Sequence, residues 1–393
     1  MLFVKTSKLK QGMRLARPIY NKDGVLLYER NSKLTAQGIQ SIKAFNLIGL
    51  FILEPAEPVP PMTQEDILFE RFQTMTVFSL REELLKIKEE KKRGAKIQVI
   101  VNNILRRYGH LDKKINFIQN LRSKEDYVYK HALNVGILCA MMTHMLNMKL
   151  EDQMDVIFAA LLHDIGKLSL PKAIADKDEP NEDEKQVINT YVMAGHELIG
   201  SVFSAAPGVK RVCVQMQRIW DSFQNGSFDP KMKVPLGAKV LLVANIYDTM
   251  TAMRLDQAPE SEVATIKYLI KHSDVFHPDI VDALIQSINI LAPGVSVELS
   301  TGEKAIVIRN NETNILRPMV LGFQNNNIMD LADKEYKKLE IKDIMKTMDN
   351  RHVMDTQLLR ENGFNVPAEE DAEFQTGIAE QTEEEAAYVP GES

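Results

Sequence analysis

The sequence has few of the residues that mark a disulfide-linked, secreted or membrane-spanning protein. Two cysteines occur in 393 residues, Cys139 and Cys213, each inside an apolar stretch. Two isolated thiols give neither a disulfide framework nor a paired-cysteine metal site, so we interpret both as small core residues in a reducing compartment. No window reaches the roughly 18 apolar residues of a membrane helix, and the N-terminus lacks the apolar stretch of a signal peptide. We expect a soluble, cytoplasmic protein with no membrane partner.

The sequence also lacks an excess of positive charge. Its 48 Lys and Arg residues against 54 Asp and Glu residues give a formal net charge of -6. A protein that coats nucleic acid needs a clustered basic surface, so we expect no nucleic-acid polymer as a partner. A small anion, held by one or two local cations, is still compatible with this balance. The length, with 45% hydrophobic residues, predicts two or three domains.

Turn signals and breaks in the pattern divide the chain into segments. Residues 1–55 are predicted to form a small α+β module, with Thr35 capping a short helix through Ala44 and a strand at 48–53. Residues 56–119 are interpreted as a linker, proline-rich at 55–61, and a charged helix. The outer face of that helix is either simply solvated or serves in connection or dimerisation.

The rest of the chain is predicted to be mainly helical. Residues 120–290 have the pattern of a compact all-α domain, and residues 291–323 alternate like strands of a short β-rich extension. Residues 324–393 are predicted to hold a polar helix at 327–350 and a disordered tail. From Pro367 that tail contains many Glu and Asp residues and no Lys or Arg.

The strongest local signal is an apolar run that ends in His163, Asp164 and, after Ile-Gly, Lys167. Adjacent helical residues lie about 100° apart, so His163 and Asp164 can both reach one ion from a single turn. A carboxylate and an imidazole on a buried helix are costly unless they are paired or bind metal. Lys167 shares their face and favours a phosphate site. A purely structural His–Asp pair is the alternative.

A second histidine supports the metal hypothesis. His131 is in line with Val135, Leu138 and Met142 at helical spacing, so it faces the interior. A lone histidine on an apolar face is more often a core residue than a ligand. Here the helix ending in His163 follows after a short loop, so antiparallel packing brings the two histidines together.

These motifs resemble HD-GYP domains. The resemblance rests on residues 126–135 (DYVYKHALNV), residues 161–167 (LLHDIGK) and residues 234–254 (VPLGAKVLLVANIYDTMTAMR), and it covers about residues 1–323. It implies an HD-type helical bundle between the α+β module and the β-rich extension. It also implies a family that hydrolyses cyclic di-GMP or related cyclic dinucleotides with two or three metal ions, such as iron or manganese.

Carried over position by position, the resemblance makes His131, His163 and Asp164 metal ligands, and Asp164 and Lys167 catalytic. Arg254 matches the arginine that meets ligand phosphate, together with Lys167. The remaining ligand positions depart from the family pattern: Tyr191-Val192 replaces HisPro, Gln215 to Gln217 replaces HisHisGlu, Asn225 to Pro230 replaces the GlyTyrPro loop, and Asn245 replaces an aspartate.

These departures predict a weakened site. Asn245 offers a neutral amide oxygen, so the site is expected to hold one divalent ion weakly, or none. Asp248 lies three residues later on the same face and is the candidate substitute for the missing carboxylate. His196 is interpreted as a surface or packing residue.

Our leading hypothesis is an HD-GYP relative that binds a cyclic dinucleotide, another small phosphate ligand or a partner, with little or no phosphodiesterase activity. One alternative is a working one-metal hydrolase that acts on another phosphate ester. Another is a protein-interaction scaffold, with a protein partner or a second copy of the chain.

Overall fold

The computed structural model describes residues 2–20, 25–44, 49–53, 63–120, 122–175, 177, 180–254, 259–311, 313–324 and 326–344. The proline-rich linker predicted at 55–61 and the acidic tail from Pro367 lie outside these residues. Within them, every helix is too short or too polar to cross a membrane.

The N-terminal module is an α+β unit, as predicted. Thr35 accepts a hydrogen bond from the Gly38 amide at 3.0 Å, which confirms it at the start of the helix. The module has a core of its own, which includes Leu15, Leu34 and Ile42. Its antiparallel sheet has the order β1-β5-β2, beside a β3–β4 hairpin. The elements are β1 (Leu2–Lys5), η1 (Thr6–Lys8), β2 (Arg14–Leu15), β3 (Ile19–Tyr20), β4 (Leu26–Tyr28), α1 (Ala36–Ala44) and β5 (Gly49–Leu53).

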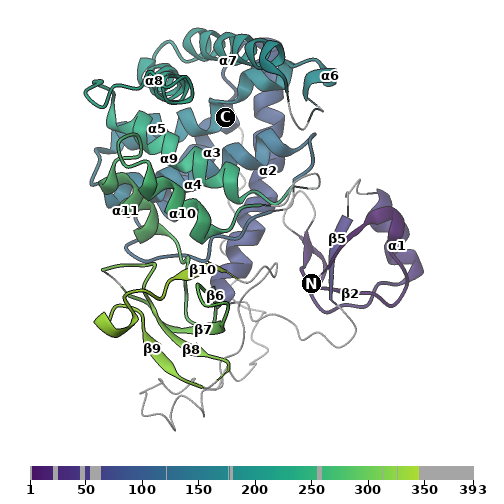
Figure 1. The fold of residues 1–393 in the computed structure, drawn as a ribbon. Helices are drawn as coiled ribbons and strands as arrows, with labels where there is room; N and C mark the ends of the chain where they lie inside the picture. The colour runs from purple at the N-terminus through teal and green to yellow at the C-terminus, as the bar shows by residue number, and fades with distance from the viewer. Residues whose placement is uncertain are drawn as a thin grey trace. The chain divides into compact units, whose positions relative to one another are not determined.

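A helical domain follows, and it confirms the mainly α prediction. Helix α4 is its centre, since every residue from His131 to Thr143 is buried. Figure 1 shows α4, α5 and α9 in the middle of the domain, and α5, α9, α11, α2 and α3 all pack on α4. The elements are α2 (Gln64–Glu90), α3 (Ala95–Tyr108), α4 (Tyr127–Met145), α5 (Leu150–Leu162), η2 (Ile165–Ser169), α6 (Lys172–Ala175), α7 (Glu182–Val202), α8 (Pro207–Gln224), α9 (Leu236–Thr251), α10 (Glu262–Lys271) and α11 (Pro278–Ser287).

Helix α2 belongs to this domain rather than to a linker. It begins at a capping box, in which Thr63 and Asp66 satisfy each other's backbone amides, and it ends where Lys91 takes a left-handed conformation, φ 54°. Its buried residues Leu80, Leu84 and Ile87 lie in the same core as those of α4 and α5. One face of this charged helix therefore packs against the domain.

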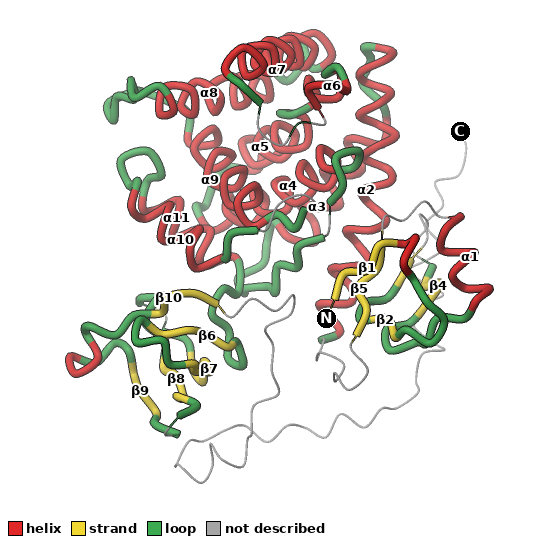
Figure 2. Tube along the Cα trace, turned by 45° about the vertical axis from the view of Figure 1, so that its right-hand side comes forward, coloured by secondary structure: helices red, strands yellow, loops and turns green. Residues whose placement is uncertain are grey.

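The predicted polar helix at 327–350 is wrong over the residues that the structure describes. The chain there forms β9 (Ile328–Asp330), a short turn of helix η3 (Lys334–Tyr336) and β10 (Ile341–Ile344). Lys, Glu and Leu favour helix locally, but pairing of β10 with β6 overrides that preference. The antiparallel sheet, seen in yellow in Figure 2, has the order β10-β6-β7-β8-β9, with β6 (Ser296–Leu299), β7 (Lys304–Arg309) and β8 (Met319–Gly322).

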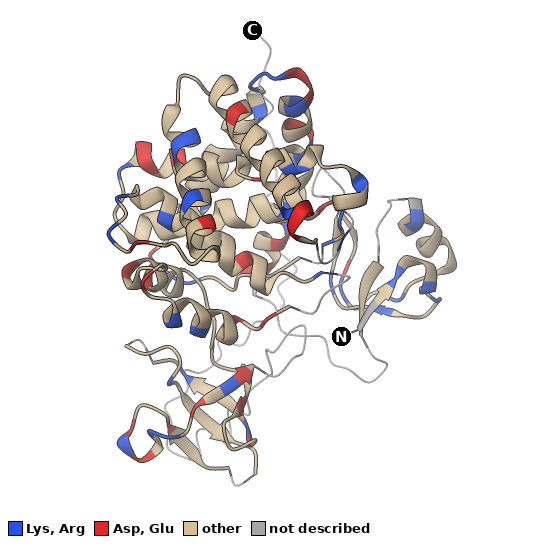
Figure 3. Cartoon of the chain, turned by 45° about the horizontal axis from the view of Figure 1, so that its top comes forward, with Lys and Arg blue, Asp and Glu red and all other residues tan. Residues whose placement is uncertain are grey.

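Charges of both signs are distributed over the described helices. In the view of Figure 3, Lys and Arg segments alternate with Asp and Glu segments over the helical domain.

Candidate metal centre

The His163–Asp164 pair lies where α5 ends. His163 follows the last residue of α5 and donates its amide to the Ala159 carbonyl at 2.8 Å, after which the chain turns into η2. Gly166 lets this turn lie directly against α7, because a Cβ atom there would be 2.0 Å from the Tyr191 carbonyl oxygen. The glycine therefore fixes the backbone that carries the pair.

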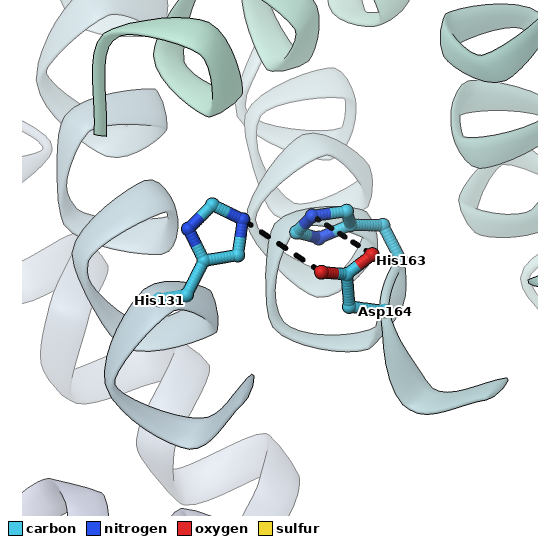
Figure 4. A group of neighbouring side chains, drawn as sticks. All are labelled: His131, His163 and Asp164. Carbon is cyan, nitrogen blue, oxygen red and sulfur yellow. Dashed lines mark ion pairs between the residues drawn. The ribbon is translucent and has the colours of Figure 1, made fainter. Parts of the chain in front are cut away.

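Three polar side chains meet at this point, as the sequence predicted. Ligand atoms of His131, His163 and Asp164 all lie within 4.8 Å of one another, and all three residues are buried. His131 Nε2 is 3.8 Å from Asp164 Oδ2, and His163 Nε2 is 3.6 Å from Asp164 Oδ1. Figure 4 shows the His131 ring, carried by α4, turned toward His163 and Asp164. The two imidazole rings are 5.2 Å apart, edge to face.

The His163 ring is set up as a metal ligand. Its Nδ1 donates to the Ala160 carbonyl at 2.8 Å, so its Nε2 presents a lone pair. That Nε2 is buried and has no hydrogen-bond partner. Burial lowers the pKa of His163 to about 4, although the neighbouring Asp164 carboxylate favours its charged form. A neutral buried imidazole with an unused lone pair is what a divalent ion requires.

His131 is oriented by Asp248, which lies behind the ring. Asp248 Oδ2 accepts from His131 Nδ1 at 2.7 Å and from Arg122 Nη1 at 2.6 Å. Asp248 Oδ1 accepts from Arg122 Nη2 at 2.7 Å, Asn134 Nδ2 at 3.0 Å and Gln119 Nε2 at 3.1 Å. Burial raises the pKa of Asp248, but Arg122 and His131 outweigh it, so the pKa is lowered and the carboxylate stays ionised. A carboxylate that only accepts holds the proton of His131 on Nδ1 and turns Nε2 toward the cluster.

Asn245 adds an oxygen at the front of the same ring. Its Oδ1 is 2.9 Å from His131 Nε2. With the ring proton on Nδ1, His131 Nε2 and Asn245 Oδ1 can share one cation, and without a cation the Asn245 amide can turn so that its Nδ2 donates to Nε2. Two neighbouring ligands at about 2.1 Å from one ion are separated by about 3 Å in octahedral geometry. The residues present therefore fit a divalent ion bound by His131, His163, Asp164 and Asn245.

The two predicted cationic residues lie at this cluster in different ways. Lys167 Nζ donates to Asp164 Oδ2 at 2.7 Å. Burial lowers the pKa of Lys167, but the Asp164 carboxylate outweighs it, so the pKa is raised and the side chain stays charged. Arg254 lies over the Tyr127 ring, 5.4 Å from its centroid, and the same ring stacks on His131. Arg254 thus reaches the edge of the cluster through Tyr127.

Comparison with known proteins agrees with this geometry. A family model described as an HD domain matches residues 116–280. The cyclic di-GMP phosphodiesterase PA4108 of Pseudomonas aeruginosa is 24% identical over 204 residues, which is 52% of this chain and 49% of that protein. The cyclic di-GMP phosphodiesterase response regulator RpfG of Xanthomonas campestris pv. campestris is 25% identical over 142 residues, 35% of this chain and 37% of the regulator. The matches thus span about half or less of each relative.

Residues 116–280 match the HD domain family, and together with the two relatives this match supports an HD-GYP domain protein. Its helical domain holds the histidines and aspartate that the HD motif names, on the turn between α5 and η2 and on the neighbouring α4. The resemblance inferred from the sequence is confirmed.

Two of the departing ligand positions have contacts of another kind. Gln217 donates to Asp221 at 2.8 Å on its own helix, and Tyr191 contributes its backbone carbonyl to the contact with Gly166. Among the residues that the structure describes, the group of His131, His163 and Asp164 is the only one found with metal-ligand spacing.

One interpretation from the sequence needs correction, and one is narrowed to a single alternative. Asp248 does not replace the carboxylate missing at 245, because it contacts Nδ1 of His131, on the opposite side of the ring from Nε2. Of the two alternatives for His196, surface or packing residue, the structure shows the second, because His196 is fully buried on α7. Burial lowers the pKa of His196, and Asp164 acts against that shift.

Sequence reasoning missed Arg122 altogether. It is the largest fully buried side chain described and forms a bidentate ion pair with Asp248. The local sequence Leu-Arg-Ser-Lys-Glu-Asp gives no hint of burial, because its neighbours are those of an exposed loop.

Proposed function

We propose that this HD domain binds a cyclic dinucleotide of the cyclic di-GMP type beside one divalent metal ion, and hydrolyses it slowly or not at all. The observation that carries the proposal is the pair of imidazoles, His131 and His163, whose Nδ1 protons are both committed elsewhere while their buried Nε2 atoms lie near the Asp164 carboxylate. Iron and manganese suit a site of imidazole and oxygen ligands.

The ligand class follows from the cations and from the relatives. Lys167 is held at the site by Asp164, and Arg254 at its edge by Tyr127, so both can meet phosphate oxygens. Both curated relatives are named as cyclic di-GMP phosphodiesterases. A phosphodiester with two charged groups matches two cations on neighbouring sides of one cluster.

Slow hydrolysis follows from the ligands that are absent from the pattern. A bound divalent ion lowers the pKa of water toward about 7, and a second ion clamps the phosphate in many hydrolases. Here one Asp164 oxygen is already paired with Lys167, and Gln217 is paired with Asp221, so these residues leave a second ion poorly supported. The chain's own side chains would bind and orient the phosphate more effectively than they would activate water.

A second candidate is a one-metal hydrolase of another phosphate ester. The observation in its favour is that the HD histidines and aspartate are complete and correctly oriented. A smaller ester needs fewer contacts than a cyclic dinucleotide, and one ion can be sufficient for it.

The test uses the full chain, purified without chelator, and a His163→Ala/Asp164→Ala double variant as control. Metal analysis is expected to find up to one iron or manganese per chain in the wild type and less in the variant. Cyclic di-GMP is expected to bind the wild type in calorimetry, with linear product forming no faster than with the control. Product well above the control would refute slow hydrolysis. Absence of both metal and nucleotide binding would refute the proposal as a whole.

Hydrolysis of a generic aryl phosphate ester identifies the second candidate. If the wild type cleaves that ester in a metal-dependent way and does not bind cyclic di-GMP, the one-metal hydrolase replaces the cyclic-dinucleotide proposal.

A further inference from the structure

Helix α2 packs on elements that carry the metal centre, although it lies outside residues 116–280, which match the HD domain family. Two of its side chains reach inward at points four turns apart. Gln73 enters the buried hydrogen-bond network behind His131, and Lys88 reaches the turn that follows Lys167. Helix α2 packs on both α4 and η2, the elements that carry these groups.

Gln73 acts as a hydrogen-bond donor in both of its contacts. Its Nε2 donates to Asn134 Oδ1 at 2.9 Å and to the Ile118 carbonyl at 3.2 Å, while its own Oε1 is buried without a partner. An unpaired buried acceptor is unfavourable, so the two hydrogen bonds that Nε2 donates must stabilise this orientation of the Gln73 amide. Gln73 itself is fully buried.

The hydrogen bond from Gln73 also affects how Asn134 meets Asp248. The Gln73 donor to Asn134 Oδ1 favours the amide orientation in which Asn134 Nδ2 donates to Asp248 Oδ1 at 3.0 Å and to Gln119 Oε1 at 3.1 Å. The opposite amide orientation would bring an oxygen against a carboxylate oxygen. Asp248 in turn holds the Nδ1 proton of His131. A donor on α2 thereby helps to fix which nitrogen of a metal ligand carries the lone pair.

The second contact of α2 is made by Lys88 with the η2 turn. Its Nζ donates to the Leu168 carbonyl at 3.0 Å, at the end of η2 and next to Lys167. This carbonyl lies at a helix end, where it has no partner within the turn itself. Lys88 therefore ties the turn that carries His163, Asp164 and Lys167 to α2.

We propose that α2 is a positioning element of the metal centre, acting through Gln73 on the Asn134–Asp248–His131 network and through Lys88 on the η2 turn. The inference rests on the proposed metal site. It adds two residues from outside the HD domain match that set how tightly an ion is held, without touching it. A displacement of α2 would then change metal affinity.

The test measures Co²⁺ binding to the full chain by competition with a chromophoric chelator, together with the visible absorption spectrum of the Co²⁺ form. Gln73→Met removes the donor with little change in volume. Gln73→Glu replaces the donor by an acceptor and favours the opposite orientation of the Asn134 amide. We expect Co²⁺ affinity to fall by about threefold to tenfold in Gln73→Met and by about tenfold to a hundredfold in Gln73→Glu, with an altered spectrum in both.

Lys88→Met is expected to weaken Co²⁺ about threefold to tenfold. Lys86→Met on the same helix is the matched control, since Lys86 is exposed. It should bind Co²⁺ like the wild type. Urea unfolding of each metal-free variant separates positioning from simple loss of fold, because a merely structural residue changes stability and leaves the affinity and spectrum of the folded protein unchanged.

The outcomes separate this inference from the function on which it rests. A wild type that binds no Co²⁺ refutes the metal site itself. A wild type that binds Co²⁺, with Gln73 and Lys88 variants that are folded and bind it equally well, refutes the role of α2 and leaves the metal site standing.

Discussion

The buried Arg122–Asp248 ion pair allows a quantitative test of how the centre is held together. Arg122→Met removes the guanidinium and keeps most of the side chain's apolar length. Asp248 then keeps only His131, Asn134 and Gln119 as donors, in a place with no access to water. Because a buried charge without its partner is strongly unfavourable, we expect unfolding free energy to fall by about 3–5 kcal/mol.

The magnitude follows from burial and geometry. The pair is bidentate, with N–O distances of 2.6 and 2.7 Å, and both side chains are 0% exposed. The Lys96–Glu82 pair is a matched comparison, since its distance is 2.9 Å but its side chains are 61% and 59% exposed. Water screens the second pair, so Lys96→Met is expected to cost less than about 1 kcal/mol.

The assay is urea unfolding of chelator-treated protein, followed by circular dichroism. The set comprises Arg122→Met, Asp248→Leu and the double variant. Since the double variant leaves no isolated charge, its cost should be smaller than the sum of the single costs by about 2 kcal/mol or more. Costs of the single variants as small as that of Lys96→Met, or strictly additive costs, would refute the reasoning.

Three further outcomes follow from the same coordinates. The free energy of unfolding of the metal-free protein should rise by up to about 3 kcal/mol as the pH is raised from 4 to 6.5. Burial lowers the pKa of His163 to about 4, so in this window the unfolded chain binds a proton that the folded protein does not. If the pH dependence of the urea midpoint is the same in wild type and in His163→Asn, this prediction is wrong. Gly166→Ala should lower the free energy of unfolding by at least about 2 kcal/mol, because the new methyl group would lie 2.0 Å from the Tyr191 carbonyl oxygen. An unchanged melting temperature would exclude that contact. Asn245→Asp should tighten Co²⁺ binding about tenfold, since it adds a charged ligand 2.9 Å from His131 Nε2; equal affinity in chelator competition would place Asn245 outside the ion's reach.

The histidines and aspartate were predictable because each is marked by its own local pattern. His131 follows the apolar spacing of α4, and His163 and Asp164 end the apolar run of α5, so burial could be inferred from neighbours in sequence. Two consecutive helices joined by a short loop then bring them together. The same kind of argument gave the capping residue Thr35 and the start of α1.

The network behind His131 could not be predicted in this way. Arg122 and Asp248 are 126 residues apart, and Gln73 and Asn134 are 61 apart, so no local spacing connects them. Arg122 also stands in a polar segment that is typical of a loop. The strand β10 was missed for a related reason, because its partner β6 lies far away in sequence and only pairing reveals it.

The charges of the side chains in the metal centre determine which type of divalent ion it would bind. Each of its buried carboxylates already has a cation from the chain, Lys167 for Asp164 and Arg122 for Asp248, and position 245 carries a neutral amide. A divalent ion would therefore enter a site with little negative charge to offset its lost hydration. Magnesium and calcium rely on several charged or carbonyl oxygens, whereas imidazole nitrogen favours transition metals through the strength of the bond itself. Because two of the four proposed ligands are imidazoles, this balance favours iron, cobalt or manganese over magnesium. The neutral amide at 245 would weaken the proposed ion binding, and it would add to the poor support for a second ion in slowing the proposed hydrolysis.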